Sequence, residues 1–351
     1  MTRLERLERA LEERHLDALI VTDVVNVRWL TGFTGSNAAA VVGPGLRRFV
    51  TDFRYLTQSA EQVPEEFERE IATELLPVVA RDLPARVGFD DLKLAVKSLE
   101  RLRDAAGDDV ELIGAGGVVE DLRAIKDEAE IAKMRAAAQL ADAALKTVLE
   151  RGLAGRTERA VGLDLEFELR RLGAEAISFP PIIAAGEHGA LPHAVPRDVD
   201  IPRGTFVVVD WGAQLDGYCS DCTRTFATGE VDPRHAEVYE VVLAAQLASL
   251  DAVRPGPTGR EVDAMAREII AAAGHGEHFG HGLGHGVGLE VHEGPRLSAS
   301  SDTLLAAGQV VTVEPGVYVP GVIGVRIEDL VVVTADGHDV LSSLPKDLTV
   351  V

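Results

Sequence analysis

The stretch TFVVVDWGAQLDGYCSDCTRTF, residues 205–226, has two runs of β-forming residues on either side of Asp216–Gly217. An Asp-Gly pair between such runs favours a two-residue type I′ turn. That turn places Asp221 opposite Gly212, and Asp210 then lies two residues further along the same face of the sheet. The sequence therefore predicts a β-hairpin on which the carboxylates of Asp210 and Asp221 are diagonal neighbours.

A second stretch, VVTVEPGVYVPGVIGVRIEDLVVV at residues 310–333, has the same organisation. A turn through Pro320–Val322 sets a register in which Glu314 lies directly opposite Glu328, whereas Asp329 points to the other face. Like charges that face each other across a ladder destabilise it. Buried unpaired carboxylates cost several kcal/mol each. Two such pairs on apolar strands indicate carboxylates that are grouped to hold cations.

The segment HGEHFGHGLGHGVGLEVHEGP, residues 275–295, contains five of the ten histidines. A histidine-rich stretch alone more often reflects exposed or core histidines. Together with four carboxylates in the same half of the chain, however, one imidazole suits a pair of Mn²⁺, Co²⁺ or Zn²⁺ ions. Two such ions about 3.5–4 Å apart activate water and polarise a carbonyl. Metal-assisted hydrolysis is the expected reaction, although residue types alone do not separate peptidases from phosphoesterases.

The pattern of the N-terminal part of the chain, which precedes these motifs, predicts a small α/β domain. Leu4, Leu7 and Leu11 lie on one face of an N-terminal helical pattern. Strand-like runs and a helical run then alternate along the chain, which is typical of an α/β domain. The strand-like runs are at residues 18–22, 25–30, 38–42, 48–51 and 87–89, and the helical run is at 92–106.

A second domain is expected after the glycine cluster at residues 114–117. Asp127 followed by Glu130 is a capping-box pattern, and it predicts a long helix that ends near Gly152. Further helices and strands follow, so the chain as a whole is α/β (α+β). The helices are expected at 157–172, 234–252 and 259–273, and the strands at 177–185, at 205–228 and towards the end of the chain.

Composition excludes several classes of protein. The formal net charge of −22 argues against a nucleic-acid partner, because phosphate binding needs clustered Lys and Arg. Without a long apolar run or a signal-peptide pattern, we expect no membrane association and a cytoplasmic location. The two cysteines, Cys219 and Cys222, suit a reducing compartment. Their three-residue spacing on a strand points them to opposite faces, which argues against a zinc site.

Taken together, the motifs resemble the pita-bread metallopeptidases, in particular the branch of aminopeptidase P and prolidase (Xaa-Pro dipeptidase). The resemblance extends over nearly the whole chain in the family's order. It rests on WLTGFTGSNAA (29–39), LRAIKDEAEIAKMRAAA (122–138), ALPHAVP (190–196), VDWGAQLDGYCSDCTRTF (209–226), GHGLGHGVGLEVHEGPRL (280–297), TVEPGVYV (312–319) and GVRIEDLVVV (324–333). It implies a creatinase-like domain over residues 1–122, a pita-bread catalytic domain over 123–351, and cleavage of the bond before proline by a manganese-dependent homodimer.

The resemblance also implies roles for individual residues. The expected metal ligands are Asp210, Asp221, His285, Glu314 and Glu328. Of these, Asp221 and Glu328 would bridge both ions, Asp210 would bind one, and His285 with Glu314 the other. Glu314 would also be the general base towards the attacking water.

Four further residues have expected roles around the substrate. His193 and His292 would contact the scissile carbonyl or the leaving nitrogen. Arg326 would orient the site, unless it only forms an ion pair with Glu328, and His193 could instead cap a loop. His281 would line the pocket.

One departure from the family pattern falls at Glu187–His188, where relatives usually carry Asn. It bears on substrate contacts and not on the metals.

Several alternatives stay open or are disfavoured by the sequence. A methionine aminopeptidase would lack the front domain and the LPHAVP and GVRIED stretches. A catalytically inactive binding or chaperone relative would lack some of the five expected metal ligands. A creatinase-like C–N hydrolase would not have this ligand set either. A prolidase, restricted to dipeptides, needs a cation for the substrate carboxylate, and Arg296 could supply it. The modest length and compact front domain favour a small aminopeptidase P acting on longer proline-containing peptides.

Overall fold

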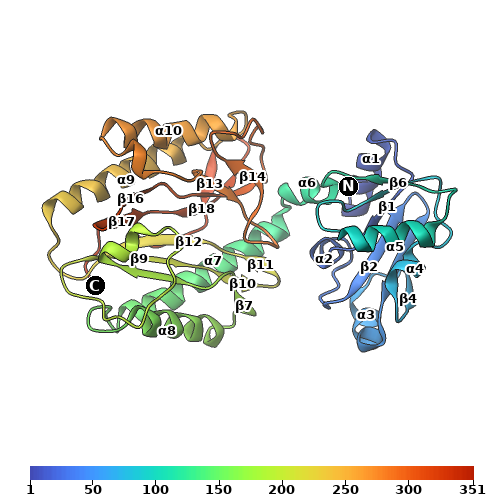
Figure 1. The fold of residues 1–351 in the computed structure, drawn as a ribbon, viewed down its shortest axis with the longest axis horizontal. Coiled ribbons are helices and arrows are strands. Elements are labelled where there is room, and N and C mark those ends of the chain that lie inside the picture. The colour runs from blue at the N-terminus through green and yellow to red at the C-terminus, as the bar shows by residue number, and fades with distance from the viewer. The chain divides into compact units, whose positions relative to one another are not determined.

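The computed structural model describes residues 1–351 and divides into two compact units, Met1–Arg123 and Ala124–Val351 (Figure 1). Both units mix helices and strands, so the predicted mixed α/β class is confirmed. No helix is both long and apolar enough to cross a membrane.

The first unit is built on a six-stranded sheet with the strand order β4-β3-β2-β1-β5-β6. Strands β1, β2 and β3 pair antiparallel, while β4, β5 and β6 join in parallel. The strands are β1 (Ala18–Val21), β2 (Ala38–Gly43), β3 (Leu46–Thr51), β4 (Glu68–Ile71), β5 (Arg86–Phe89) and β6 (Glu111–Gly114). The helices are α1 (Arg3–Glu13), α2 (Val24–Thr31), α3 (Leu56–Gln62), α4 (Leu75–Val79), α5 (Val96–Ala106) and α6 (Val118–Ala124).

The strand expected at residues 25–30 is wrong, because this segment is the helix α2. The β-branched residues of the segment suggested a strand, but its two ends carry helix caps. The Asp23 carboxylate accepts a hydrogen bond from the Val25 N–H, and Gly32 ends the helix at a φ of 76°. An N-cap carboxylate and a left-handed glycine are standard helix boundaries, and here they outweigh strand propensity.

The second unit has two helical layers with strands between them (Figure 1). Helices α7 (Glu128–Leu149) and α8 (Glu158–Arg171) cover one side, and α9 (Pro233–Ala252) and α10 (Gly259–Ala272) cover the other. The predicted capping box of Asp127 with Glu130 is confirmed at the start of α7.

Thirteen strands make up the sheets of this unit. They are β7 (Ala176–Ile177), β8 (Ile182–Ala185), β9 (Phe206–Trp211), β10 (Ala213–Leu215), β11 (Tyr218–Cys219), β12 (Cys222–Ala227), β13 (Gly284–Gly286), β14 (Glu293–Leu297), β15 (Val310–Val313), β16 (Gly316–Val319), β17 (Ile323–Arg326), β18 (Asp329–Val333) and β19 (His338–Val340). The single strand expected at 177–185 is broken into β7 and β8. Two prolines, Pro180 and Pro181, lie in the break, and proline cannot donate to a ladder.

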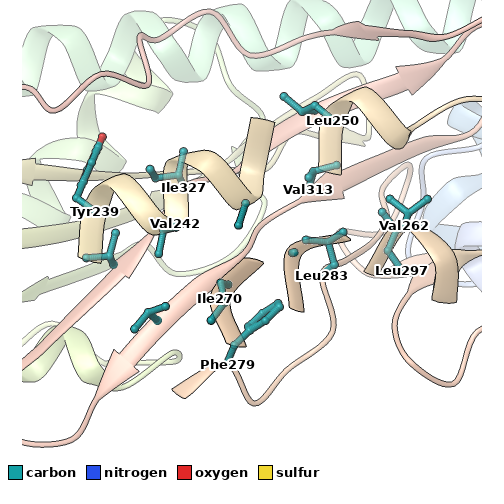
Figure 2. Close-up of a cluster of buried hydrophobic side chains, with 14 of the residues drawn as sticks. Tyr239, Val242, Leu250, Val262, Ile270, Phe279, Leu283, Leu297, Val313 and Ile327 are labelled. Carbon is teal, nitrogen blue, oxygen red and sulfur yellow. The ribbon is translucent and has the colours of Figure 1, made fainter. Parts of the chain in front are cut away.

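Two apolar cores hold these layers in place. One packs α7 and α8 against the face of β9 that carries Val207, Val209 and Trp211. The other packs α9 and α10 against the C-terminal strands, and it includes Leu283, Val313 and Ile327 (Figure 2).

Because side chains alternate along a strand, the immediate neighbours of these core residues point the opposite way. Asp210 stands between Val209 and Trp211, and Glu314 and Glu328 follow Val313 and Ile327. The polar side chains therefore face away from both cores.

Candidate metal centre

The first hairpin forms as its turn residues predict. Asp216 and Gly217 both have positive φ, 49° and 81°, as a type I′ turn requires. Leu215 pairs with Tyr218, and further along the ladder Asp210 pairs with Thr223. The same register places Asp221 beside Gly212, so the predicted diagonal arrangement of Asp210 and Asp221 is confirmed.

The second hairpin also has the expected register. Strands β16 and β17 pair Val319 with Ile323, and β15 and β18 pair Val313 with Asp329. Glu314 and Glu328 lie between these two paired segments, which share one register, so the two carboxylates stand opposite each other.

One cavity of about 520 Å³ in the second unit collects the predicted residues. All ten of them line it, namely His193, Asp210, Asp221, His281, His285, His292, Arg296, Glu314, Arg326 and Glu328. Ligand atoms of Asp221, His285 and Glu328 lie within 4.8 Å of one another. His285 Nε2 is also 3.3 Å from Glu314 Oε1. Side chains that are more than a hundred positions apart in the sequence thus converge on one point.

The buried carboxyl groups of the cavity are not matched by an equal number of positively charged side chains. Burial, and then the neighbouring carboxylates, raise the pKa of Asp221 and of Glu328 well above the usual range. Burial also raises the pKa of Glu314 to about 7 and lowers that of His285 to about 3. Buried carboxyl groups this close together cannot all be ionised unless a cation lies among them.

Asp210 shows where such a cation would fit. Its Oδ2 accepts a hydrogen bond from Arg326 Nη2 at 2.7 Å, whereas the buried Oδ1 has no hydrogen-bond partner. A buried carboxylate oxygen without a partner is costly, and a metal ion would satisfy it. Several carboxylate oxygens and one neutral imidazole nitrogen are a donor set that fits divalent cations.

Two threonines that the sequence analysis missed orient the carboxylates. Thr223 Oγ1 donates to Glu328 Oε2 at 2.7 Å and accepts from Arg326 Nε at 3.0 Å. Thr312 Oγ1 donates to Glu314 Oε1 at 3.1 Å and accepts from the His285 N–H at 3.1 Å. Thr312 is a polar residue on an otherwise apolar strand, two positions from Glu314, and that spacing could have identified it. Thr223 lies on a strand that also carries Arg224 and Thr225, so no such pattern marks it.

Arg326 is buried and links several parts of the cavity wall. Besides Asp210, it donates through Nη1 to Tyr318 Oη at 2.9 Å and to the Pro192 carbonyl at 3.1 Å. Its ion pair is with Asp210 at 2.7 Å, rather than the pair with Glu328 considered from the sequence. Tyr318, which the sequence analysis did not single out, extends this chain to His281 Nε2 at 2.9 Å.

The remaining predicted residues surround the carboxylates. The rings of His292 and His285 are 4.3 Å apart, and Arg296 pairs with His285 across the β13–β14 ladder. Burial lowers the pKa of His292. His193 lies on the loop after η2 (Gly186–Ala190). The apolar part of the cavity wall is formed by Phe179, Pro180, Pro181, Ile182, Pro192, Ala194, Val195 and Pro196.

Residues that the sequence analysis set aside have other contacts. Asp329 forms ion pairs with Arg224 and Lys346, on the face opposite to Glu328. Cys219 and Cys222 are free and buried on different strands. At the departure from the family pattern, His188 Nδ1 lies 3.0 Å from the Glu158 carboxylate and does not line the cavity.

Comparison with known proteins gives two family matches. Residues 132–335 match metallopeptidase family M24, and residues 3–125 match the creatinase/prolidase N-terminal domain.

Individual relatives match over nearly their full length. The Xaa-Pro dipeptidase of Pyrococcus furiosus is 36% identical over 357 residues, which cover 99% of each chain. The solved structure of the Xaa-Pro dipeptidase from Bacillus anthracis has a TM-score of 0.95 at 41% identity and 99% coverage of both chains. That of the X-Pro aminopeptidase from Thermotoga maritima has a TM-score of 0.90 at 34% identity, covering 98% of this chain and 100% of the other.

Proposed function

Since the chain belongs to metallopeptidase family M24, preceded by a creatinase/prolidase N-terminal domain, we propose that this metallopeptidase hydrolyses the peptide bond before proline. The family and the pita-bread fold expected from the motifs are confirmed. We assign residues 1–122 to the creatinase-like domain and 123–351 to the catalytic domain.

The convergence of five metal-binding side chains in one cavity carries this proposal. Family membership implies divalent metal ions, and we propose two, with Mn²⁺ first and Co²⁺ or Zn²⁺ as alternatives. The proposed ligands are Asp210, Asp221, His285, Glu314 and Glu328. When bound, the ions would supply Lewis acidity towards the scissile carbonyl and lower the pKa of the attacking water.

The side chains around the ions have distinct proposed roles. Glu314 takes the proton of the attacking water, from a position where its Oε1 also accepts a hydrogen bond from Thr312 Oγ1. His292 and His193 hold the carbonyl oxygen or return a proton to the leaving nitrogen. Arg326 keeps the Asp210 carboxylate in place through a 2.7 Å ion pair, so it acts by orientation.

Proline preference is supported by the apolar part of the same cavity. A bond to proline has no amide N–H, so the site must recognise the ring rather than a hydrogen-bond donor. Phe179, Pro181 and Ile182 offer an apolar wall beside the carboxylates. This wall could accept the pyrrolidine ring while the carbonyl faces the metal ligands.

Within the Xaa-Pro branch, we propose a small aminopeptidase P that releases the first residue of Xaa-Pro peptides. A dipeptidase is the second candidate, and one observation favours it. Arg296 is an exposed cation on the cavity wall, where it could bind the free carboxylate of a dipeptide. Relatives of both names match this chain over almost its full length.

The experiment that tests the function uses the purified protein loaded with Mn²⁺. We expect hydrolysis of Ala-Pro-Ala and none of Ala-Ala-Ala, with loss of activity after exhaustive chelation and recovery on adding Mn²⁺. Turnover of Ala-Pro alone would replace the aminopeptidase by the dipeptidase. Full activity after chelation, or no cleavage of any Xaa-Pro substrate, would contradict the proposed function.

A further inference from the structure

A buried ion pair lies just outside the cavity and has no part in the chemistry described above. Lys126 Nζ is 2.5 Å from Glu293 Oε1, and the two side chains are only 1% and 6% exposed. Lys126 immediately precedes Asp127, the N-cap of α7, while Glu293 directly follows His292. The pair therefore joins the beginning of a long helix to a segment of the cavity wall.

Both partners are held by close packing. The Lys126 N–H donates to the Gly308 carbonyl at 2.8 Å, which fixes the backbone from which the side chain extends. On the other side, a Cβ added to Gly288 would lie 2.3 Å from Glu293 Oε1, so the carboxylate rests against a bare backbone. Replacing a buried ion pair by apolar residues is often neutral or stabilising, so global stability is a weak explanation for this one.

Glu293 also occupies a particular place in the sheet. In the β13–β14 ladder His285 pairs with Arg296, but the next residue, Gly286, pairs with Glu293, so two extra residues of β14 bulge out. Bulges re-aim side chains next to active sites. The two extra residues lie between Glu293 and Arg296, and His292 immediately precedes Glu293.

We propose that Lys126 and Glu293 are a positioning pair that fixes the β14 bulge and thereby aims His292 at the reacting carbonyl. The pair touches neither substrate nor metal in this role, which rests on the function proposed above. Removing it should let the bulge relax and displace the His292 ring from its place beside His285. The four proposed carboxylate ligands lie on other segments, and His285, which pairs with β14, is also held by the hydrogen bond from its N–H to Thr312 Oγ1, so the ions should stay bound.

The test uses Lys126→Met and, as a second variant in case the first does not fold, the nearly isosteric Glu293→Gln, both in the Mn²⁺-loaded protein. We expect kcat for the cleaved Xaa-Pro peptide to fall by about 10- to 100-fold, the range typical of residues that orient a site's ligands. Bound manganese per chain and KM should change by less than about twofold. Lys126→Arg, which keeps the cation, should retain more activity than Lys126→Met.

Arg135→Met is the matched control. It removes a cation from the same helix, where Arg135 pairs with Asp339 on the surface. This variant should keep the wild-type kcat, because its partner lies outside the cavity wall.

A double-mutant cycle with His292→Ala separates positioning from general damage. If the pair acts through His292, Lys126→Met should cost far less in the His292→Ala background than in the wild type. Equal losses in both backgrounds, or a wild-type kcat in Glu293→Gln, would overturn the inference. A wild-type protein that cleaves no Xaa-Pro peptide would instead overturn the proposed function.

Discussion

Glu314 combines the two requirements of the site, because it is a proposed metal ligand and the proposed base. Burial raises its pKa from 4.5 to about 7, although Arg326 acts in the opposite direction. At pH values between these two pKa values, Glu314 is protonated in the folded protein and ionised in the unfolded chain. The contribution of Glu314 to the free energy of unfolding of the metal-free protein therefore falls as the pH rises from about 4.5 to about 7.

This sign can be tested with Glu314→Gln in the metal-free protein. The variant removes the ionisable carboxyl but keeps an acceptor for Thr312 Oγ1. We expect Glu314→Gln to raise the melting temperature relative to wild type at pH 8, and to raise it much less at pH 5. An equal difference at both pH values would show that Glu314 does not titrate in this window.

Residue identities indicated the carboxylates that line the cavity better than the groups that orient them. Asp210 could be placed because it stands out as a carboxylate on the apolar strand β9, and Glu328 because the turn through Gly321 sets its register opposite Glu314. Tyr318 and Thr223 could not, because their roles depend on Arg326, whose partners come from segments far apart in the chain. Its bond to the Pro192 carbonyl, for example, spans 134 positions. Such contacts follow from the tertiary fold and have no local pattern.

At the scale of elements, turn chemistry and alternation were sufficient for the two hairpins. Asp216–Gly217 sets the first register and the turn through Gly321 sets the second, so every side chain beyond each turn is assigned to a face. The same reasoning failed at α2, where apolar β-branched residues were given more weight than the caps Asp23 and Gly32. Short apolar segments are ambiguous between helix and strand, and the caps decide between them.

Gly324 on β17 shows how closely the elements around the cavity pack. A Cβ at this position would lie 1.7 Å from the Gly189 carbonyl of η2, which leads into the loop of His193. Gly324→Ala must push η2 away, and we expect a loss of about 1–3 kcal/mol in the free energy of unfolding. Its kcat should also fall, since the loop of His193 moves with η2.

Gly280→Ala serves as the comparison, because a Cβ there meets nothing within 4 Å. Denaturant unfolding of the two variants checks the prediction. If Gly324→Ala is as stable as Gly280→Ala, the contact between β17 and η2 is looser than described.

At the scale of the whole molecule, the cavity is lined entirely by residues of the second unit, from Phe179 to Glu328. The first unit has its own sheet and core and provides none of the residues that line this cavity. A homodimer, which the family resemblance implies, would give it a role at the partner's cavity. Light scattering should then give twice the 37.5 kDa of one chain, whereas a monomer would contradict the proposed dimer.

The most direct test of the metal centre is anomalous diffraction from crystals of the Mn²⁺-loaded protein. We predict two anomalous peaks about 3.5–4 Å apart, enclosed by Asp210, Asp221, His285, Glu314 and Glu328. Crystals of fully active protein that show no peak among these five side chains, or peaks only elsewhere, would contradict the account.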